Sequence, residues 1–120
     1  MQRRGVFNEA VYNKLEERRR MKCLITYSEL NLECQLGLDF AGKNSQRDRN
    51  ILADMLGTIS KHEFDKGKPM LSAIVVMKNS HPPEPSFGFY NWAKKIGAWN
   101  PAQETENKFY FRQLRELGYP

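Results

Sequence analysis

The 120-residue sequence contains no apolar run long enough to cross a membrane. Its longest apolar stretch, Met70–Met77, is interrupted by Ser72, whereas a membrane-spanning helix needs about 20 predominantly apolar residues. The first residues are basic, but no apolar segment follows them, so a secretory leader is not predicted. We therefore expect a protein of the cytoplasm that does not bind membranes.

Cysteine is scarce, and the usual sequence patterns of a metal centre are missing. Cys23 and Cys34 are the only cysteines, and neither belongs to a Cys-x-x-Cys pair or a cysteine–histidine cluster. A zinc site is therefore not predicted. Both cysteines lie within two residues of a leucine, which favours two reduced and mostly buried thiols. A glycine-rich phosphate-binding loop is also missing, so we expect neither a metal nor a cofactor.

Signals of catalysis are weak. Neither His62 nor His81 has a cysteine or serine at a recognised catalytic spacing, which favours two surface histidines. A metal-dependent nuclease could use Glu63 and Asp65 before a strand and Lys78 at its end, but such enzymes need carboxylates that converge on one point. The strand itself carries no carboxylate, so we expect a protein that is not an enzyme.

Positive charge is unevenly distributed along the chain. The net charge is +5, and residues 1–22 carry seven basic and three acidic side chains. A basic surface favours nucleic acid, because counterions are released from the phosphates on binding. Part of this charge is expected to be paired within a helix, since Glu16 and Glu17 lie three or four residues before Arg19 and Arg20.

Capping residues and apolar periodicity predict five helices. Thr26 and Glu29 form a capping-box pattern at the start of the second helix, which is expected to run from Tyr27 to about Gln35. Glycine readily takes the left-handed conformation of a helix terminus, so glycines are expected to end three of the helices. The expected caps are Asn8, Thr26, Ser45, Ser86 and Asn100, and the expected terminators are Gly37, Gly67 and Gly97.

The segment Met70–Met77 is rich in β-branched residues and predicts a strand buried on both faces. A single strand needs a partner, and Lys22–Ile25 is the expected one. This order resembles that of a winged helix, a helix-turn-helix variant with a small sheet. In a winged helix, the chain forms a helix, a short strand, two helices and a strand in turn. The predicted class is therefore α+β and mostly α: a winged-helix-like fold with a two-stranded sheet and two C-terminal helices.

The chain is short enough for a single domain. We expect three parts within it: a basic N-terminal helix over residues 1–22, a winged-helix-like core over 23–80, and C-terminal helices over 81–120.

The start of the third predicted helix is the strongest candidate for a DNA-reading surface. In a helix-turn-helix protein the second helix of the pair enters the major groove with its N-terminal residues first. Arginine reads guanine, asparagine and glutamine read adenine, and the helix amides can hold a phosphate. The alternative is a solvated helix start with an ordinary cap. The predicted base and phosphate contacts here are Lys43, Asn44, Ser45, Gln46, Arg47, Arg49 and Asn50.

Additional phosphate contacts are expected from Lys78, which follows the predicted strand where a wing would lie, and from Arg18, Arg19 and Arg20 of the first helix. A protein-interaction module is the second hypothesis. It would use Phe87 and Tyr90 on the outer face of the fourth helix together with His81 in the proline-rich loop, because aromatic side chains often anchor interfaces.

Two stretches resemble known proteins. "TYSEL", followed by "GKPMLSAIVV" and "PPEPSFGF", is similar to a pattern in small uncharacterised bacterial proteins that carry G-x-P-x-L-S-A-x-V-V, a proline and G-F-F downstream of a TYxEL helix. The resemblance implies no activity. It suggests an accessory-genome setting, such as a phage or mobile-element factor that binds a host or defence protein.

Residues 25 to 77 also resemble, more weakly, the winged-helix DNA-binding half of alkyltransferase-like proteins. Tyr27 and Glu29 match the start of the family's first helix, and Arg47 or Arg49 would match its arginine finger. Where that family has an active-site Cys-His-Arg, this chain has Met70–Ser72. The resemblance therefore implies DNA binding without alkyl transfer.

Overall fold

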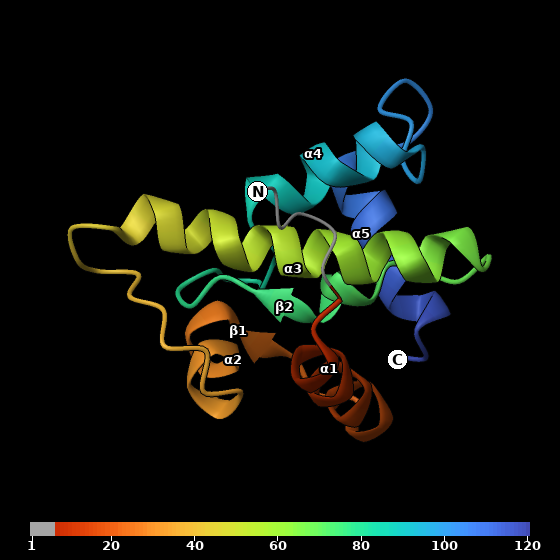
Figure 1. Ribbon diagram of the computed structural model, residues 1–120. Coiled ribbons are helices and arrows are strands. Elements are labelled where there is room, and N and C mark those ends of the chain that lie inside the picture. Colours follow the sequence, from red (N-terminus) through yellow and green to blue (C-terminus); the bar gives the residue numbers. More distant parts are fainter. Residues whose placement is uncertain (1–6) are drawn as a thin grey trace.

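The computed structural model describes residues 7–120, so the first six residues of the predicted basic segment lie outside the described residues. Five helices and a two-stranded sheet make up the fold (Figure 1). The mostly helical α+β class is confirmed. In chain order, the elements are α1 (Glu9–Met21), β1 (Ile25–Thr26), α2 (Tyr27–Glu33), α3 (Ser45–Asp65), the 3-10 turn η1 (Leu71–Ile74), β2 (Val75–Val76), α4 (Phe87–Ile96) and α5 (Glu106–Glu116).

The two strands pair in parallel, with Ile25 opposite Val75. Parallel neighbours need a crossover connection, and α2 and α3 supply it. The predicted partner segment of the second strand, Lys22–Ile25, is confirmed only at its end, since β1 comprises Ile25 and Thr26. Figure 1 shows α3 crossing one side of the strands, with α1 and α2 on the other. No helix among residues 7–120 is long and apolar enough to cross a membrane.

The centre of the core is the segment from Met70 to Val76, every residue of which is buried. The predicted burial of Met70–Met77 is confirmed except at Met77, which is exposed, but the prediction of one continuous strand is wrong. Residues Leu71–Ile74 form a 3-10 turn, and only Val75–Val76 pair with β1. A short apolar run of this kind cannot be told from a buried helical segment by periodicity, because both are apolar on all sides.

Side chains from α3 and α5 bind the irregular backbone of η1. The Met70 amide donates to Oε1 of Gln113 at 2.7 Å, and the Tyr110 hydroxyl donates to the Ala73 carbonyl at 3.0 Å. Ser60 lies fully buried and hydrogen-bonds to the Ser72 hydroxyl at 2.6 Å. Buried polar groups need such partners, so these contacts explain how polar residues come to lie inside the core.

Helix boundaries follow the predicted caps in part. Asn8 accepts the Val11 amide at 3.0 Å, and Thr26 and Glu29 form the predicted capping box. The prediction that Gly37 ends α2 is wrong. The helix ends at Glu33, and Gln35 takes the left-handed conformation (φ 53).

At the start of α3 the N-cap is Asn44 rather than Ser45. The N-cap of the last helix is Thr105, whose side chain accepts the Lys108 amide at 3.2 Å, and not the predicted Asn100. Asn100 instead caps a turn, with its side chain accepting the Ala102 amide at 3.0 Å. Asn and Pro initiate turns as readily as helices, which accounts for this misplaced start.

The two cysteines are free, but they are less buried than predicted. Cys23 is exposed and Cys34 is half-buried. The Cys34 thiol lies against the carbonyl of Ala10, and desolvation raises its pKa above the usual value. Cys23 follows the last turn of α1, where its amide bonds back to the helix, and this exposed position explains the difference.

Candidate functional site

The first two turns of α3 project beyond α2 and the strands at one end of the molecule (Figure 1). Every predicted DNA contact in this segment except Ser45 is exposed, and Ser45 is half-buried. The structure therefore brings these side chains together on one free helix end. The exposed residues are Lys43, Asn44, Gln46, Arg47, Arg49 and Asn50.

Asp48 joins the start of α3 to the loop that precedes it. Its carboxylate is buried, accepts the Asp39 amide at 2.8 Å and receives Arg47 Nε at 3.2 Å. The hydrogen bond from the Asp39 amide, followed by the bond from Arg47, lowers the pKa of Asp48 below its usual value. The loop before α3 is thereby attached to the first turn, and the Arg47 side chain remains 68% exposed.

The polar side chains of this end are partly engaged with one another. Arg49 donates to the Phe40 carbonyl at 2.8 Å, and Gln46 donates to Asn50 at 3.0 Å. An arginine has five N–H donors, so Arg49 keeps most of its hydrogen-bonding capacity. The amides of Gln46 and Arg47 have no hydrogen-bond partner among residues 7–120, and such amides at a helix start can hold an anion.

The loop after β2 extends to the same end of the molecule as the start of α3 (Figure 1). It is closed by a hydrogen bond from the Met77 amide to the Glu84 carbonyl at 2.8 Å, with Ser80 bridging inside it. Lys78 and His81 are both exposed on this loop. The loop that carries Lys78 therefore lies toward the projecting start of α3 (Figure 1).

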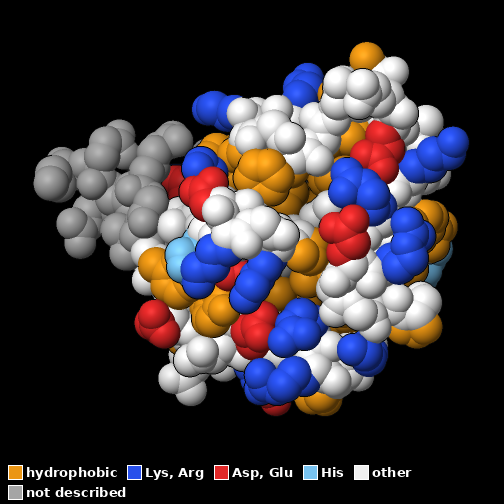
Figure 2. Space-filling model, turned by 90° about the vertical axis from the view of Figure 1, so that its right-hand side faces the viewer, with side chains coloured by type: hydrophobic (Ala, Val, Ile, Leu, Met, Phe, Trp, Pro, Cys, Tyr) orange, Lys and Arg blue, Asp and Glu red, His pale blue; other side chains and the backbone are white. Residues whose placement is uncertain are grey.

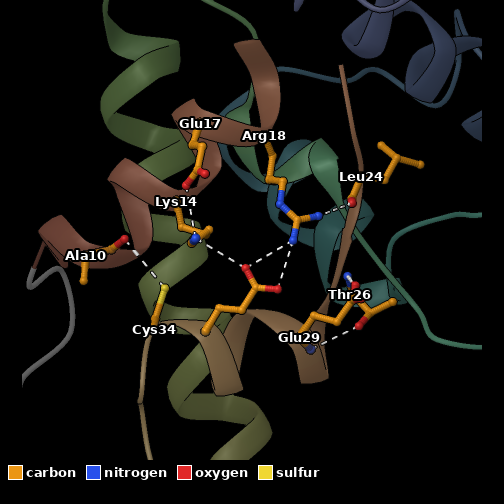
Figure 3. A network of polar contacts seen from close by, with 9 residues as sticks. Ala10, Lys14, Glu17, Arg18, Leu24, Thr26, Glu29 and Cys34 are labelled. Atoms are coloured by element: carbon orange, nitrogen blue, oxygen red, sulfur yellow. Dashed lines mark hydrogen bonds and ion pairs between the residues drawn. The ribbon is translucent and has the colours of Figure 1, made fainter. Parts of the chain in front are cut away.

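The three arginines of α1 lie on the other side of the strands from α3 (Figure 1). Arg18 donates to the Leu24 carbonyl at 2.9 Å (Figure 3) and pairs with Glu33 at 3.0 Å, so it joins α1 to α2 and to the residue before β1. Arg19 pairs with Glu16 at 2.8 Å, as predicted, and Arg20 is exposed. The structure does not bring these arginines to the projecting end of α3.

Glu33 accepts from two cations, because Lys14 also pairs with it, at 3.3 Å. Desolvation alone would raise the pKa of Glu33, but the hydrogen bonds from Lys14 and Arg18 lower it below its usual value. Both cations are thus neutralised within the fold. They contribute to the junction of α1 and α2 rather than to a phosphate-binding surface.

A second concave feature, missed by sequence reasoning, lies between α3 and α4. This groove has a volume of about 720 Å³. Gly57 and Gly88 open it by presenting no side chain, and Trp92 lies at its side with Lys95 5.7 Å from the ring centroid. A glycine in the interior of a long predicted helix, Gly57, is its one sequence signal. The lining residues are Ala53, Asp54, Gly57, Thr58, Lys61, Gly88, Asn91, Trp92 and Lys95.

The aromatic residues proposed for partner binding divide between surface and core. Phe87 is 70% exposed beside the groove residue Gly88. Tyr90 is buried, 5.9 Å from Trp99 between ring centroids, so its predicted outward position is wrong. Burial raises the pKa of Tyr90 to about 12. Tyr90 faces inward because its ring packs against Trp99 and against Phe89, which in turn contacts Tyr110 of α5.

The residues of the disfavoured nuclease arrangement are not brought together. Asp65 forms an ion pair with Lys61 at 2.8 Å, at the end of α3 remote from the loop that carries Lys78 (Figure 1). Within the described part of the chain, no group of three or more His, Cys, Asp and Glu side chains could hold a metal ion.

Comparison of the chain with protein-family models, with curated proteins and with solved structures gives no match. The two resemblances therefore stay predictions, and function has to be argued from the residues of this chain.

Proposed function

We propose that the protein binds duplex DNA through the N-terminal end of α3, as a non-enzymatic accessory or regulatory domain. The main support is the cluster of six exposed side chains on this helix end, all of types that contact bases or phosphates. Arg47 and Arg49 would read base edges together with Gln46 and Asn50. Lys43 and the free helix amides would hold phosphates.

In this proposal α2 and α3 act as a helix-turn-helix pair of the winged-helix type, with α3 as the recognition helix. The loop from Met77 to Glu84 takes the place of the wing and offers Lys78 to the DNA backbone. It leads into α4 and not into a returning strand, so the wing would contribute one phosphate contact at most. The net charge of +5 supports association with a polyanion.

Binding of a labelled duplex, measured by fluorescence anisotropy at two salt concentrations, tests the proposal. We expect the double substitution Arg47→Ala with Arg49→Ala to weaken binding about tenfold or more, since each base contact contributes about 1–3 kcal/mol. The matched control removes two exposed basic residues elsewhere, Lys66→Ala with Arg115→Ala. Equal loss in both double variants, or no binding by the intact protein, contradicts the proposal.

A second candidate function is protein binding at the groove between α3 and α4. It is favoured by Phe87, a large apolar side chain left 70% exposed beside a groove that contains Trp92. In a pull-down from an extract of the source cells, Phe87→Ala should lose the partner. Phe111→Ala, which removes a side chain that is 53% exposed on α5, should retain it. Retention by both variants contradicts this candidate.

A further inference from the structure

Positive charge does not by itself identify a surface that reads DNA. The opposite end of the molecule, where α3 ends, also displays Lys and Arg side chains among Asp and Glu (Figure 2). A side chain that reads a base must also point in a defined direction, and ordering a long side chain on binding costs conformational entropy. An arginine that is held in place before DNA arrives is therefore better suited to this task than a freely moving one.

Asp48 holds Arg47 at one nitrogen. The residue Asp48 is only 5% exposed, and its Oδ1 accepts Nε of Arg47 at 3.2 Å. Its other carboxylate oxygen, Oδ2, accepts the Asp39 amide at 2.8 Å. The direction of the carboxylate is therefore set by the backbone of the preceding loop as well as by the arginine.

The loop that sets this direction is itself held by a side chain. The Asp39 carboxylate accepts the amides of Ala41 and Gly42, each at 3.0 Å. Such a turn around an aspartate is a stable local structure, because the side chain takes over hydrogen bonds of the backbone. A continuous set of hydrogen bonds therefore leads from this turn through Asp48 to the guanidinium of Arg47.

Arg47 keeps the far side of its guanidinium free. Nε is engaged by Asp48, whereas Nη1 and Nη2 make no hydrogen bond to any of residues 7–120, and the side chain is 68% exposed. In the major groove an arginine fork binds O6 and N7 of guanine, a pattern that no other base presents. The neighbouring Arg49 differs, because its Nη2 already donates to the Phe40 carbonyl at 2.8 Å.

We propose that the DNA site contains a guanine that Arg47 reads, and that Asp48 is the positioning residue that directs the Arg47 fork toward it. This inference rests on the proposed function and adds to it a base identity and a residue that contacts no DNA. Because Asp48 is buried, it acts only through Arg47. Its loss should therefore change the choice of base more than the overall affinity.

Duplexes selected from a random pool by the intact protein test the base identity. We expect the selected sites to share one G·C pair. Replacing that guanine by 7-deazaguanine removes the N7 acceptor and leaves the base pair intact. This change should weaken binding of the unaltered protein about fivefold or more and leave binding of Arg47→Ala unchanged, since only the arginine fork uses N7.

Asp48→Asn tests the positioning role. Its amide oxygen can still accept the Asp39 amide, but the negative charge that binds Arg47 is lost. We expect the preference for guanine over adenine at the selected position to fall about fivefold or more. Affinity for unrelated duplexes should stay the same or rise, because a negative charge near the phosphates is removed. Asp54→Asn removes an exposed carboxylate from the same helix and should leave the preference unchanged.

NMR relaxation of arginine Nε–H groups tests the same role in the unaltered protein without DNA. Arg47 should be more ordered than Arg115, an exposed residue whose side chain has no hydrogen-bond partner among residues 7–120. Equal mobility of the two side chains overturns the positioning role, and this measurement decides it even if Asp48→Asn does not fold.

The outcomes distinguish this inference from the proposed function. Failure to bind any duplex overturns both. Binding without a shared G·C pair, or with full affinity for 7-deazaguanine, overturns this inference alone. An unchanged guanine preference in Asp48→Asn also overturns it, as does an equal loss of affinity for all duplexes, because that loss is the sign of a purely structural role.

Discussion

The indole N–H of Trp92 donates to the carbonyl of Gly57 at 2.9 Å and joins α4 to the middle of α3. A Cβ atom at position 57 would lie 3.3 Å from the Trp92 ring, so the glycine is what allows the indole to approach. This contact joins two residues that line the α3–α4 groove and brings the two helices close together there. It also accounts for a glycine in the interior of a long helix, where glycine is otherwise unfavourable.

Replacing Trp92 by Phe should lower the free energy of unfolding by about 1–2 kcal/mol, because it removes the donor and part of the packed ring. Urea denaturation followed by circular dichroism measures the change. Asn91→Ala, an exposed position on the same helix, should change stability by less than about 0.5 kcal/mol. If the two variants are equally stable, the Trp92–Gly57 hydrogen bond does not hold α4.

Gln113 should be among the polar side chains most important for stability. Its Oε1 is the partner of the Met70 amide at 2.7 Å, and the residue is only 3% exposed. Gln113→Leu leaves a buried N–H without a partner, so we expect a loss of about 1–3 kcal/mol in the free energy of unfolding. Gln103→Leu makes the same change at an exposed position and should be nearly neutral. A neutral Gln113→Leu would show that the entry into η1 does not need this acceptor.

Much of the helical framework could be predicted because its signals are local. Each capping signal acts within one turn of its own helix. Helices start where expected after Asn8 and after Thr26, which pairs with Glu29, and one ends where expected at Gly97. The conformation of Leu71–Ile74 could not be predicted, because it depends on Gln113 and Tyr110, which lie far along the chain.

The candidate sites show the same division between local and long-range signals. The exposed start of α3 could be predicted from its run of polar residues, whereas the outward position of Tyr90 could not. On an amphipathic helix covered by α5, the side that faces the core depends on the packing of Phe89 and Tyr90 against Tyr110. The depth of the groove between α3 and α4 could not be found from sequence either, since it combines residues of two helices that lie far apart in the chain.

Stability should fall in acid partly because of Asp48. The Asp39 amide, and then Arg47, hold the folded-state pKa of Asp48 below its ordinary value of 3.8. The unfolded state therefore binds this proton first as the pH falls, so the stabilising contribution is complete above pH 3.8 and is lost as the pH drops through the folded-state pKa. Thermal unfolding across acidic pH should show a shallower decline for Asp48→Asn than for the unaltered protein. Parallel curves for the two proteins would exclude Asp48 as a contributor.

The salt dependence of DNA binding should distinguish the role of Lys78 from that of Arg47. A lysine that contacts a phosphate releases counterions on binding but does not read the base sequence. Lys78→Ala should therefore reduce the magnitude of the slope of log K against log salt by about 0.9 and weaken binding to all duplexes equally. Arg47→Ala should mainly reduce discrimination between base pairs at one position of a selected site, because a bidentate arginine reads the base edge.

Lys66→Ala provides the control for this pair of variants, since Lys66 is exposed at the far end of α3 and should change neither the slope nor the discrimination. If Lys66→Ala lowers the slope as much as Lys78→Ala does, the whole basic surface attracts DNA without a defined orientation. An unchanged base preference in Arg47→Ala would then show that α3 does not enter the groove. The proposal requires a lower salt slope in Lys78→Ala and a reduced base preference in Arg47→Ala. Only a helix docked in one orientation would place Lys78 on a phosphate and Arg47 on a base.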